Sequence, residues 1–165
     1  MNLISYIQLP PINKRLLASC ILSFLWVSNY QYHYNIEIFN SRIINIWAFS
    51  LWILSGYTYL YLHDKIKNKI PDYRLQITAS WVVYFTGLLV VEYTGYNILG
   101  IHENSARGGA LIFGLIHGNT FLHIYYMLFP ALILVVYQLT LMVPAKTVKL
   151  FQTLRRTERR FTTWP

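Results

Sequence analysis

The chain has 165 residues, of which 55% are hydrophobic, 17% are aromatic and only 12% are charged, and its formal net charge is +8. A soluble globular domain carries about 25% charged residues, so this composition excludes a soluble enzyme, a disordered tail and a secreted disulfide-rich module. The single cysteine, Cys20, also excludes an internal disulfide and a cysteine-based metal site. The composition therefore predicts an integral membrane protein.

Apolar stretches about as long as a bilayer is thick lie between the few charged stretches. A helix of roughly 20 residues crosses a hydrocarbon core of about 30 Å, and a spanning segment must be helical because lipid cannot satisfy its backbone. In chain order, the predicted spans are Leu16–Tyr30, Ile43–Leu62, Leu75–Ile101 and Gly109–Val143. The last is too long for one upright helix, so we expect it to be tilted or kinked at Pro130 and to stop at Pro144. The prediction is one all-α domain with four transmembrane helices over residues 1–165, ending in a basic tail at 144–165.

The segments outside the predicted spans alternate between many and few lysine and arginine residues. Twelve of the fourteen lie at residues 14–15, 65–74 and 146–160, and the two that remain are Arg42 and Arg107. Basic residues favour the cytoplasmic side, so both termini and the second connection are predicted to face the cytoplasm, or the matrix in a mitochondrion. Because this topology accounts for the basic clusters, we expect no nucleic acid partner.

Two ionisable residues lie inside predicted spans. Glu92 lies about nine residues from the outer end of the third span, and His117 lies about eight residues into the fourth span from the same side. An acid at this depth costs about 2.5–3.5 kcal/mol on insertion scales, so it normally faces the bundle interior and has a partner. At about 1.5 Å per residue the two lie at similar depth on antiparallel helices, which predicts a Glu92–His117 hydrogen bond. Two roles stay open for the pair: locking two helices together, or handling protons or ions.

The remaining histidines bear on metal and haem binding. His123 follows His117 by six residues, which turns it about 120° around a helix, so the two cannot easily hold one metal ion. Haem ligation by His117 or His123 is a less favoured alternative, because His33, His63 and His102 lie at predicted membrane edges. We therefore expect no directly bound cofactor and no metal, and we expect structural lipids.

Two further groups of residues are candidates for contacts. Gly114 and Gly118 form a small-xxx-small pair on the predicted fourth span, a pattern that lets two helix backbones approach closely. The polar outer loop before them carries His102, Glu103 and Arg107, which could hold an anionic headgroup or a partner's surface. The loop contains no catalytic triad, phosphate-binding loop or paired-carboxylate motif, so a solvated connector is the favoured interpretation.

The third and fourth predicted spans contain the sequences FTGLLVVEYTGYNI and RGGALIFGLIHGNTFLHI, joined by a short polar loop. Over about residues 43–125 this arrangement resembles subunit III of the haem-copper oxidases, in which a Glu followed by an aromatic residue precedes a His-Gly pair. The matching positions are Glu92 with Tyr93 and His117 with Gly118. His123 departs from the family's pattern, because the family's second histidine follows the first more closely. The chain also lacks the family's further span with a Trp-His-Phe-Val-Asp-like motif.

The resemblance implies a subunit that holds no haem or copper, packs against the catalytic subunit, binds lipid and supports proton uptake. Glu92 would be the buried acid of a lipid-lined cleft. We accordingly predict an accessory subunit, without activity by itself, of a larger respiratory or other energy-transducing complex. Its partners would be other membrane subunits and lipids, in a bacterial or archaeal cell membrane or the mitochondrial inner membrane.

Two other functions fit the same residues. A small membrane enzyme acting on a lipid or isoprenoid would use Glu92 and His117 as acid and base, in an internal pocket that opens sideways to the bilayer. A transporter or proton channel would use the same buried pair. These functions are separated by whether Glu92 and His117 line a cavity inside one protomer or face a groove filled by lipid or another chain.

Overall fold

The computed structural model describes residues 13–40, 44–103 and 114–142, and over these residues the chain is helical. Its α-helices are α1 (Lys14–Asn29), α2 (Ile46–Lys69), α3 (Tyr73–Tyr93) and α4 (Thr120–Met142). A π-helical turn, η3 (Thr94–Ile98), continues α3, and a short 3-10 turn, η2 (Glu37–Phe39), lies between α1 and α2. No extended strand occurs in this part of the chain, so the predicted all-α class is confirmed.

A short polar side chain begins each α-helix. In each case a side-chain oxygen accepts a hydrogen bond from a backbone N–H of the first turn, and the capping residues are Asn13, Asn45, Asp72 and Asn119. The first N–H groups of a helix have no partner within it, so these caps satisfy donors that would otherwise be left unpaired. The caps mark the starts of the helices more closely than the apolar runs do.

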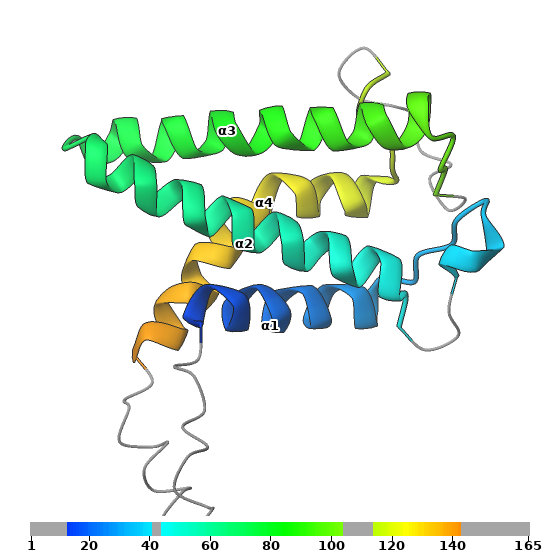
Figure 1. Cartoon of the computed structure of the whole chain (residues 1–165), viewed down its shortest axis with the longest axis horizontal. Helices are drawn as coiled ribbons and strands as arrows, with labels where there is room; N and C mark the ends of the chain where they lie inside the picture. Colours follow the sequence, from blue (N-terminus) through cyan, green and yellow to red (C-terminus); the bar gives the residue numbers. More distant parts are fainter. Residues whose placement is uncertain (1–12, 41–43, 104–113, 143–165) are drawn as a thin grey trace, which may run out of the picture.

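The helix bounds differ from the predicted spans. α2 continues from the predicted end at Leu62 to Lys69, and α4 begins at Thr120, so the predicted fourth span is not helical over residues 114–119. α4 changes direction along its length (Figure 1). Pro130 lies in its interior and supplies no N–H to the helix, as expected at a kink. The predicted stop at Pro144 lies outside the described residues.

The structure contradicts the prediction made for Gly114 and Gly118. Both precede α4, and their backbone φ angles of +81° and +144° lie in the region that favours glycine. A Cβ at Gly118 would also lie 2.8 Å from a δ-carbon of Leu122. The two glycines therefore shape the connection that leads into α4, and the prediction that they form a helix-packing pair is wrong.

α1, α2 and α4 form the packed core, and α3 lies along its edge. Phe129 and Ile133 of α4 and Leu60 of α2 are fully buried. α3 runs beside α2 and reaches α4 through long side chains, as where the Tyr84 ring stacks on Phe129. Figure 1 shows α2 and α3 meeting at their connecting turn and diverging toward their other ends.

The two ends of the bundle differ. At one, called the loop end here, lie residues 30–40, 94–103 and 114–119. At the other, the turn end, a short connection joins α2 to α3, and the Arg15 guanidinium Nε lies 2.7 Å from Oδ2 of Asp64.

Two helical segments, Tyr73–Ile98 and Thr120–Met142, are long and apolar enough to cross a membrane. Only 17% and 33% of their most apolar windows is buried inside the protein. The core helix of a soluble protein is mostly buried, so this exposure favours a surface that faces lipid. Within the described residues, α1 and α2 do not meet the same measure of length and composition.

Candidate functional site

The segment that follows α1 folds over the loop end and is fixed there by hydrogen bonds. The backbone N–H of Asn35 donates to the carbonyl of His102 at 2.8 Å, and the backbone N–H of His102 donates to the Asn35 side chain at 2.7 Å. Deeper in the protein, the Tyr32 hydroxyl accepts hydrogen bonds from the indole N–H groups of Trp26 (2.7 Å) and Trp52 (2.8 Å). The segment is therefore joined to both α1 and α2.

Glu92, the penultimate residue of α3, turns its side chain into the protein and is only 8% exposed. Its Oε1 accepts a hydrogen bond from the Tyr126 hydroxyl at 2.7 Å, and its Oε2 accepts one from the backbone N–H of His117 at 3.1 Å. The ring Nδ1 of His117 lies 3.6 Å from the same Oε2. The structure brings the two predicted residues together, although His117 precedes α4 instead of lying within it.

The His117 ring is held by stacking. Its plane lies 7° from the plane of Tyr96, and the two ring centroids are 3.8 Å apart. Burial lowers the pKa of the His117 imidazole below its ordinary value, and the nearby charge of His102 lowers it further. The ring is therefore neutral at neutral pH. A neutral imidazole beside a carboxyl group can accept a proton and pass it on.

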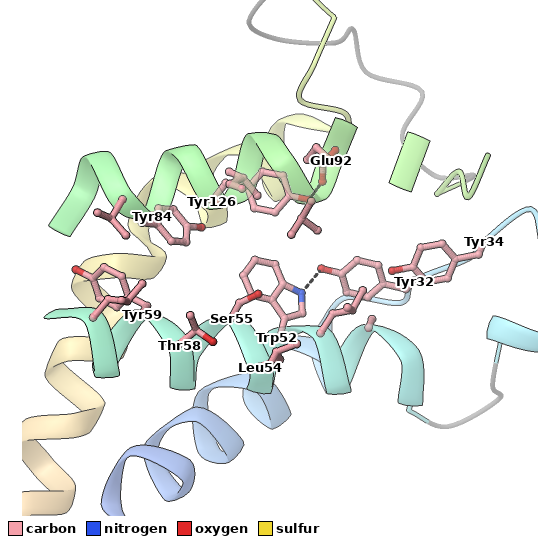
Figure 2. Close-up of a pocket in the computed structure, with 17 residues that line it drawn as sticks. Tyr32, Tyr34, Trp52, Leu54, Ser55, Thr58, Tyr59, Tyr84, Glu92 and Tyr126 are labelled. Carbon is pink, nitrogen blue, oxygen red and sulfur yellow. Dashed lines mark hydrogen bonds between the residues drawn. The ribbon is translucent and has the colours of Figure 1, made fainter. Parts of the chain in front are cut away.

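A groove of about 340 Å³ lies between α2 and α3, with Glu92 in its wall. Figure 2 shows Tyr32 and Tyr34 toward one end of the groove and Tyr59 and Tyr84 toward the other. Apolar side chains and aromatic rings make up most of the lining, and its polar members are Tyr32, Tyr34, Ser55, Thr58, Tyr59, Tyr84, Glu92 and Tyr126. Leu54 and Val91 also line it and are 62% and 50% exposed, so the groove opens between the two helices.

The Tyr32 hydroxyl contributes a hydrogen-bond donor to the groove wall. Its oxygen already accepts hydrogen bonds from two indole N–H groups, and no described residue accepts its proton. Burial raises the pKa of this hydroxyl well above its usual range, so the proton stays on the oxygen. Tyr32 therefore offers one donor on the loop-end side of the groove.

Glu103 lies in a different environment from the one that the sequence suggests. It is only 6% exposed, and its carboxylate accepts hydrogen bonds of 3.4 Å from the backbone N–H of His33 and from the Tyr30 hydroxyl. Through these hydrogen bonds the buried carboxylate joins the segment after α3 to the segment after α1. The expectation of a solvated connector is wrong at this residue.

The other predicted residues lie apart from the groove. His102 is exposed at the loop end, and His123 is half-buried in α4 with no hydrogen-bond partner for its Nε2 among the described residues. Arg107 lies outside the described residues. Over residues 13–40, 44–103 and 114–142, no three His, Cys, Asp or Glu side chains gather in a way that could hold a metal ion.

Apart from Glu92, the residues that line the groove were not predicted as site residues. The lining positions are 48, 51, 52, 54, 55, 58, 59 and 62 on α2, and 83, 84, 87, 88, 91 and 92 on α3. Both sets follow the spacing of one helix face, so each stripe can be recognised in the sequence. The spacing does not show that the two stripes face each other across a gap.

Comparison with protein-family models yields no match, and no curated protein or solved structure matches the chain either. The resemblance to subunit III of the haem-copper oxidases therefore stays a prediction from short motifs.

Proposed function

We propose that this chain is a four-span membrane protein that holds the hydrocarbon chain of a lipid or isoprenoid between α2 and α3 and transfers a proton at Glu92. The observation that carries the proposal is the position of Glu92 in the wall of an apolar groove formed within one chain. The small membrane enzyme predicted as an alternative needs a pocket of this kind that opens sideways. The groove meets that requirement with Glu92 in its wall, while His117 is not among its lining residues. A lipid-lined cleft beside Glu92 also fits the accessory subunit, so the proton transfer is what separates the two functions.

Exposed apolar side chains support the membrane setting. Each of the four α-helices carries large apolar side chains that are at least half exposed, among them Phe24, Leu54, Val90 and Leu139. Such surfaces suit a bilayer that surrounds the whole bundle. With the basic residues 65–74 on the cytoplasmic side, Glu92 lies toward the opposite membrane surface.

The shape of the groove suits a chain-like ligand. Its lining residues on α3 run from Val83 to Glu92, and those on α2 run from Ala48 to Leu62. At 1.5 Å per residue these stretches measure roughly 14 and 21 Å along the two helices. A long, mostly apolar volume with few polar groups fits a hydrocarbon chain better than a compact polar metabolite.

The chemistry proposed for Glu92 follows from its partners. The Tyr126 hydroxyl and the His117 N–H hold the carboxyl group in one orientation, at the side of the groove. The His117 side chain is 24% exposed and its Nδ1 lies 3.6 Å from Oε2, just beyond hydrogen-bond length, so a small approach of the ring would let it exchange protons between Glu92 and water. In an isomerisation the ligand gains a proton at one atom and loses one at another. Such a reaction consumes no other reactant.

Filling the groove tests whether it binds an apolar chain. A Cβ added at Gly87, which lines the groove, would have no atom within 4 Å, so Gly87→Leu starts a side chain in open space and should fill part of the groove. Gly95 has equally open surroundings but lies outside the lining, which makes Gly95→Leu the matched control. Native mass spectrometry should find an apolar molecule bound to the wild type and to Gly95→Leu but not to Gly87→Leu. Equal retention by both variants would overturn the proposal.

Deuterium exchange tests the proton transfer. In D₂O, the wild type should incorporate deuterium into the bound molecule, and Glu92→Gln should bind the molecule without exchange. Glu103→Gln is the control, because Glu103 is also buried at the loop end but does not line the groove. Unchanged exchange in Glu92→Gln would exclude Glu92 as the acid or base while leaving ligand binding in place.

A second candidate function, the accessory subunit, is favoured by the outer face of α3. Ile77, Trp81, Phe85 and Leu89 line a shallow apolar depression that is formed by α3 residues alone. A helix of a partner subunit would cover this face. Purification from native membranes in mild detergent separates the candidates: stoichiometric recovery with redox or proton-translocating subunits supports the accessory subunit, and recovery as a lone protein with a bound lipid supports the groove function.

A further inference from the structure

All the lysine and arginine residues that the structure describes lie at the turn end. They come from the start of α1, the end of α2 and the start of α3, and they are Lys14, Arg15, Lys65, Lys67, Lys69 and Arg74. Two aspartates, Asp64 and Asp72, lie among these six cations, so this end has a formal charge of +4 over the described residues. The described part of the loop end holds Glu37 and Glu103 and neither lysine nor arginine. The described bundle is therefore positive at one end only.

Most of these cations have no acidic partner. Arg15 pairs with Asp64 at 2.7 Å, and the Asp72 side chain caps α3 by accepting a hydrogen bond from the backbone N–H of Leu75. Among the described residues no carboxylate lies within ion-pair distance of the other cations, all of which are exposed. A cluster of exposed, unpaired cations attracts anions. The turn end therefore offers a surface to an anionic partner.

Two of the cations lie against one exposed aromatic ring. The guanidinium carbon of Arg15 lies 5.8 Å from the centroid of the Tyr61 ring, and the Nζ of Lys65 lies 5.4 Å from it. Lys14 reaches the end of α4, where its Nζ donates a hydrogen bond to the carbonyl of Leu141 at 3.3 Å. The positive surface thus involves the ends of all four α-helices.

Exposed apolar side chains begin directly beside the cations. Leu16 follows Arg15 and is 45% exposed, while Tyr73 and Leu75 flank Arg74 and are 71% and 59% exposed. Lysine, arginine and tyrosine beside an apolar helix surface are typical of the level at which a membrane protein passes from hydrocarbon to headgroups. Because the cations are spread over the ends of several helices, a surrounding layer of headgroups fits them better than a single acidic protein.

We propose that the turn end binds anionic phospholipid headgroups, so that the protein selects anionic lipid on this side of the membrane. Lysine and arginine form charge-assisted hydrogen bonds to phosphate oxygens, and the exposed apolar side chains suit the acyl chains. The cytoplasmic leaflet is the anionic one, in agreement with the orientation predicted from the basic residues. The inference rests on the proposed membrane setting but not on the groove or on Glu92, so its test has a separate outcome.

The surface is tested with the full chain in nanodiscs that contain equal amounts of phosphatidylglycerol and phosphatidylcholine with identical acyl chains. Native mass spectrometry of the released protein gives the ratio of the two lipids that stay bound. A lipid that the groove holds by its acyl chain contributes equally to both, because the chains are identical. The wild type should retain phosphatidylglycerol in preference, and the preference should fall as the ionic strength rises.

Three exposed lysines of α2 are changed together, to Gln in the test variant and to Arg in the matched control, at Lys65, Lys67 and Lys69. The Gln variant should lower the preference by at least about fivefold, the value of one basic residue near an anionic surface, and the Arg variant should keep it. Asp64→Asn should raise the preference, because it frees Arg15 from its partner. Equal retention of both lipids by the wild type would overturn the proposal and leave an acidic protein as the fitting partner. Full preference in the Gln variant would also overturn it.

Discussion

The two faces of α2 meet their neighbours in opposite ways. Toward α1 the contact is made by small residues, and a Cβ added at Gly56 would lie 3.0 Å from the Oγ of Ser19 and 3.2 Å from its Cβ. Toward α3 the contact is made by large aromatic side chains such as Tyr59, while a Cβ added at Gly87 would have no atom within 4 Å. The absence of a side chain at Gly56 lets α1 and α2 pack closely. The absence of one at Gly87 leaves open space between α2 and α3.

The comparison shows that one face of α2 is closely packed and the other borders an open groove, where we propose that a ligand binds. Small residues let helix backbones approach, and without a hydrophobic force between helices in lipid this close contact is what holds them together. On the other face, the rings of Tyr59 and Tyr84 meet edge to face and fill only part of the space between α2 and α3. Changes on the α1 side should therefore affect stability, and changes on the α3 side should affect the ligand.

The largest loss of stability is expected for Phe129→Ala. Phe129 is fully buried, with its ring centroid 4.9 Å from that of Trp52. Removing a buried phenyl ring should lower the free energy of unfolding by about 3–5 kcal/mol. Leu54→Ala at the rim of the groove, where the side chain is 62% exposed, should have a much smaller effect. Unfolding of both variants in detergent measures the difference, and equal losses would contradict the division between core and groove.

The next largest effect is expected for Tyr32→Phe. Its hydroxyl accepts hydrogen bonds from Trp26 and Trp52, so the substitution leaves two buried indole N–H groups unpaired. Each unpaired donor should cost about 1–3 kcal/mol of unfolding free energy. Tyr57→Phe, which removes only one exposed hydrogen bond from Asn13, serves as the control. Similar unfolding midpoints for the two variants would mean that the shared hydroxyl does not support the bundle.

Gly56→Leu compared with Gly87→Leu tests the contrast most directly. The first substitution overpacks the contact with Ser19 and should cost about 1–3 kcal/mol of unfolding free energy. The second enters open space and should leave stability almost unchanged while it removes the bound molecule. Thermal unfolding in the same detergent compares them. A lower unfolding temperature for Gly87→Leu than for Gly56→Leu would contradict the contrast between the two faces.

The smallest effect is expected from the protonation of His117. Burial lowers its folded-state pKa below the unfolded value of about 6.5. In acid the unfolded chain therefore binds the proton first, and stability should fall as the pH drops from about 6.5 toward the folded-state pKa. His117→Asn should remove this part of the pH dependence and leave the rest. Identical pH profiles for the wild type and the variant would show that His117 is not protected from protonation by the fold.

Part of this structure follows from sequence arguments. Long apolar runs with few charges require helices, and a buried acid such as Glu92 requires a partner, which explains why His117 lies beside it. Sequence spacing cannot show that a backbone N–H of His117 would be the donor. Nor can it show that Gly114 and Gly118 have positive φ angles, because the same spacing on a continuous helix would form a packing stripe.

The groove was the least predictable feature. Aromatic residues such as Trp52, Tyr59 and Tyr84 are usual in the interior of a helix bundle, so their spacing predicts only a buried face. The gap between α2 and α3 depends on how far the two helices diverge. The contacts that hold α3 against the rest of the bundle, such as that of Tyr126 with Glu92, join residues distant in the sequence.

The sideways opening of the groove has a consequence for how its occupancy is measured. Under the proposed function, with Leu54 and Val91 exposed at its rim, a ligand would reach the groove from the surrounding lipid and not from the aqueous phase. Occupancy then follows the mole fraction of ligand in the bilayer, so added vesicles or detergent dilute the ligand at constant water volume. Dissociation constants from different preparations should therefore be compared as mole fractions of ligand in the lipid. Two apparent dissociation constants that differ in molar units can describe the same partition equilibrium.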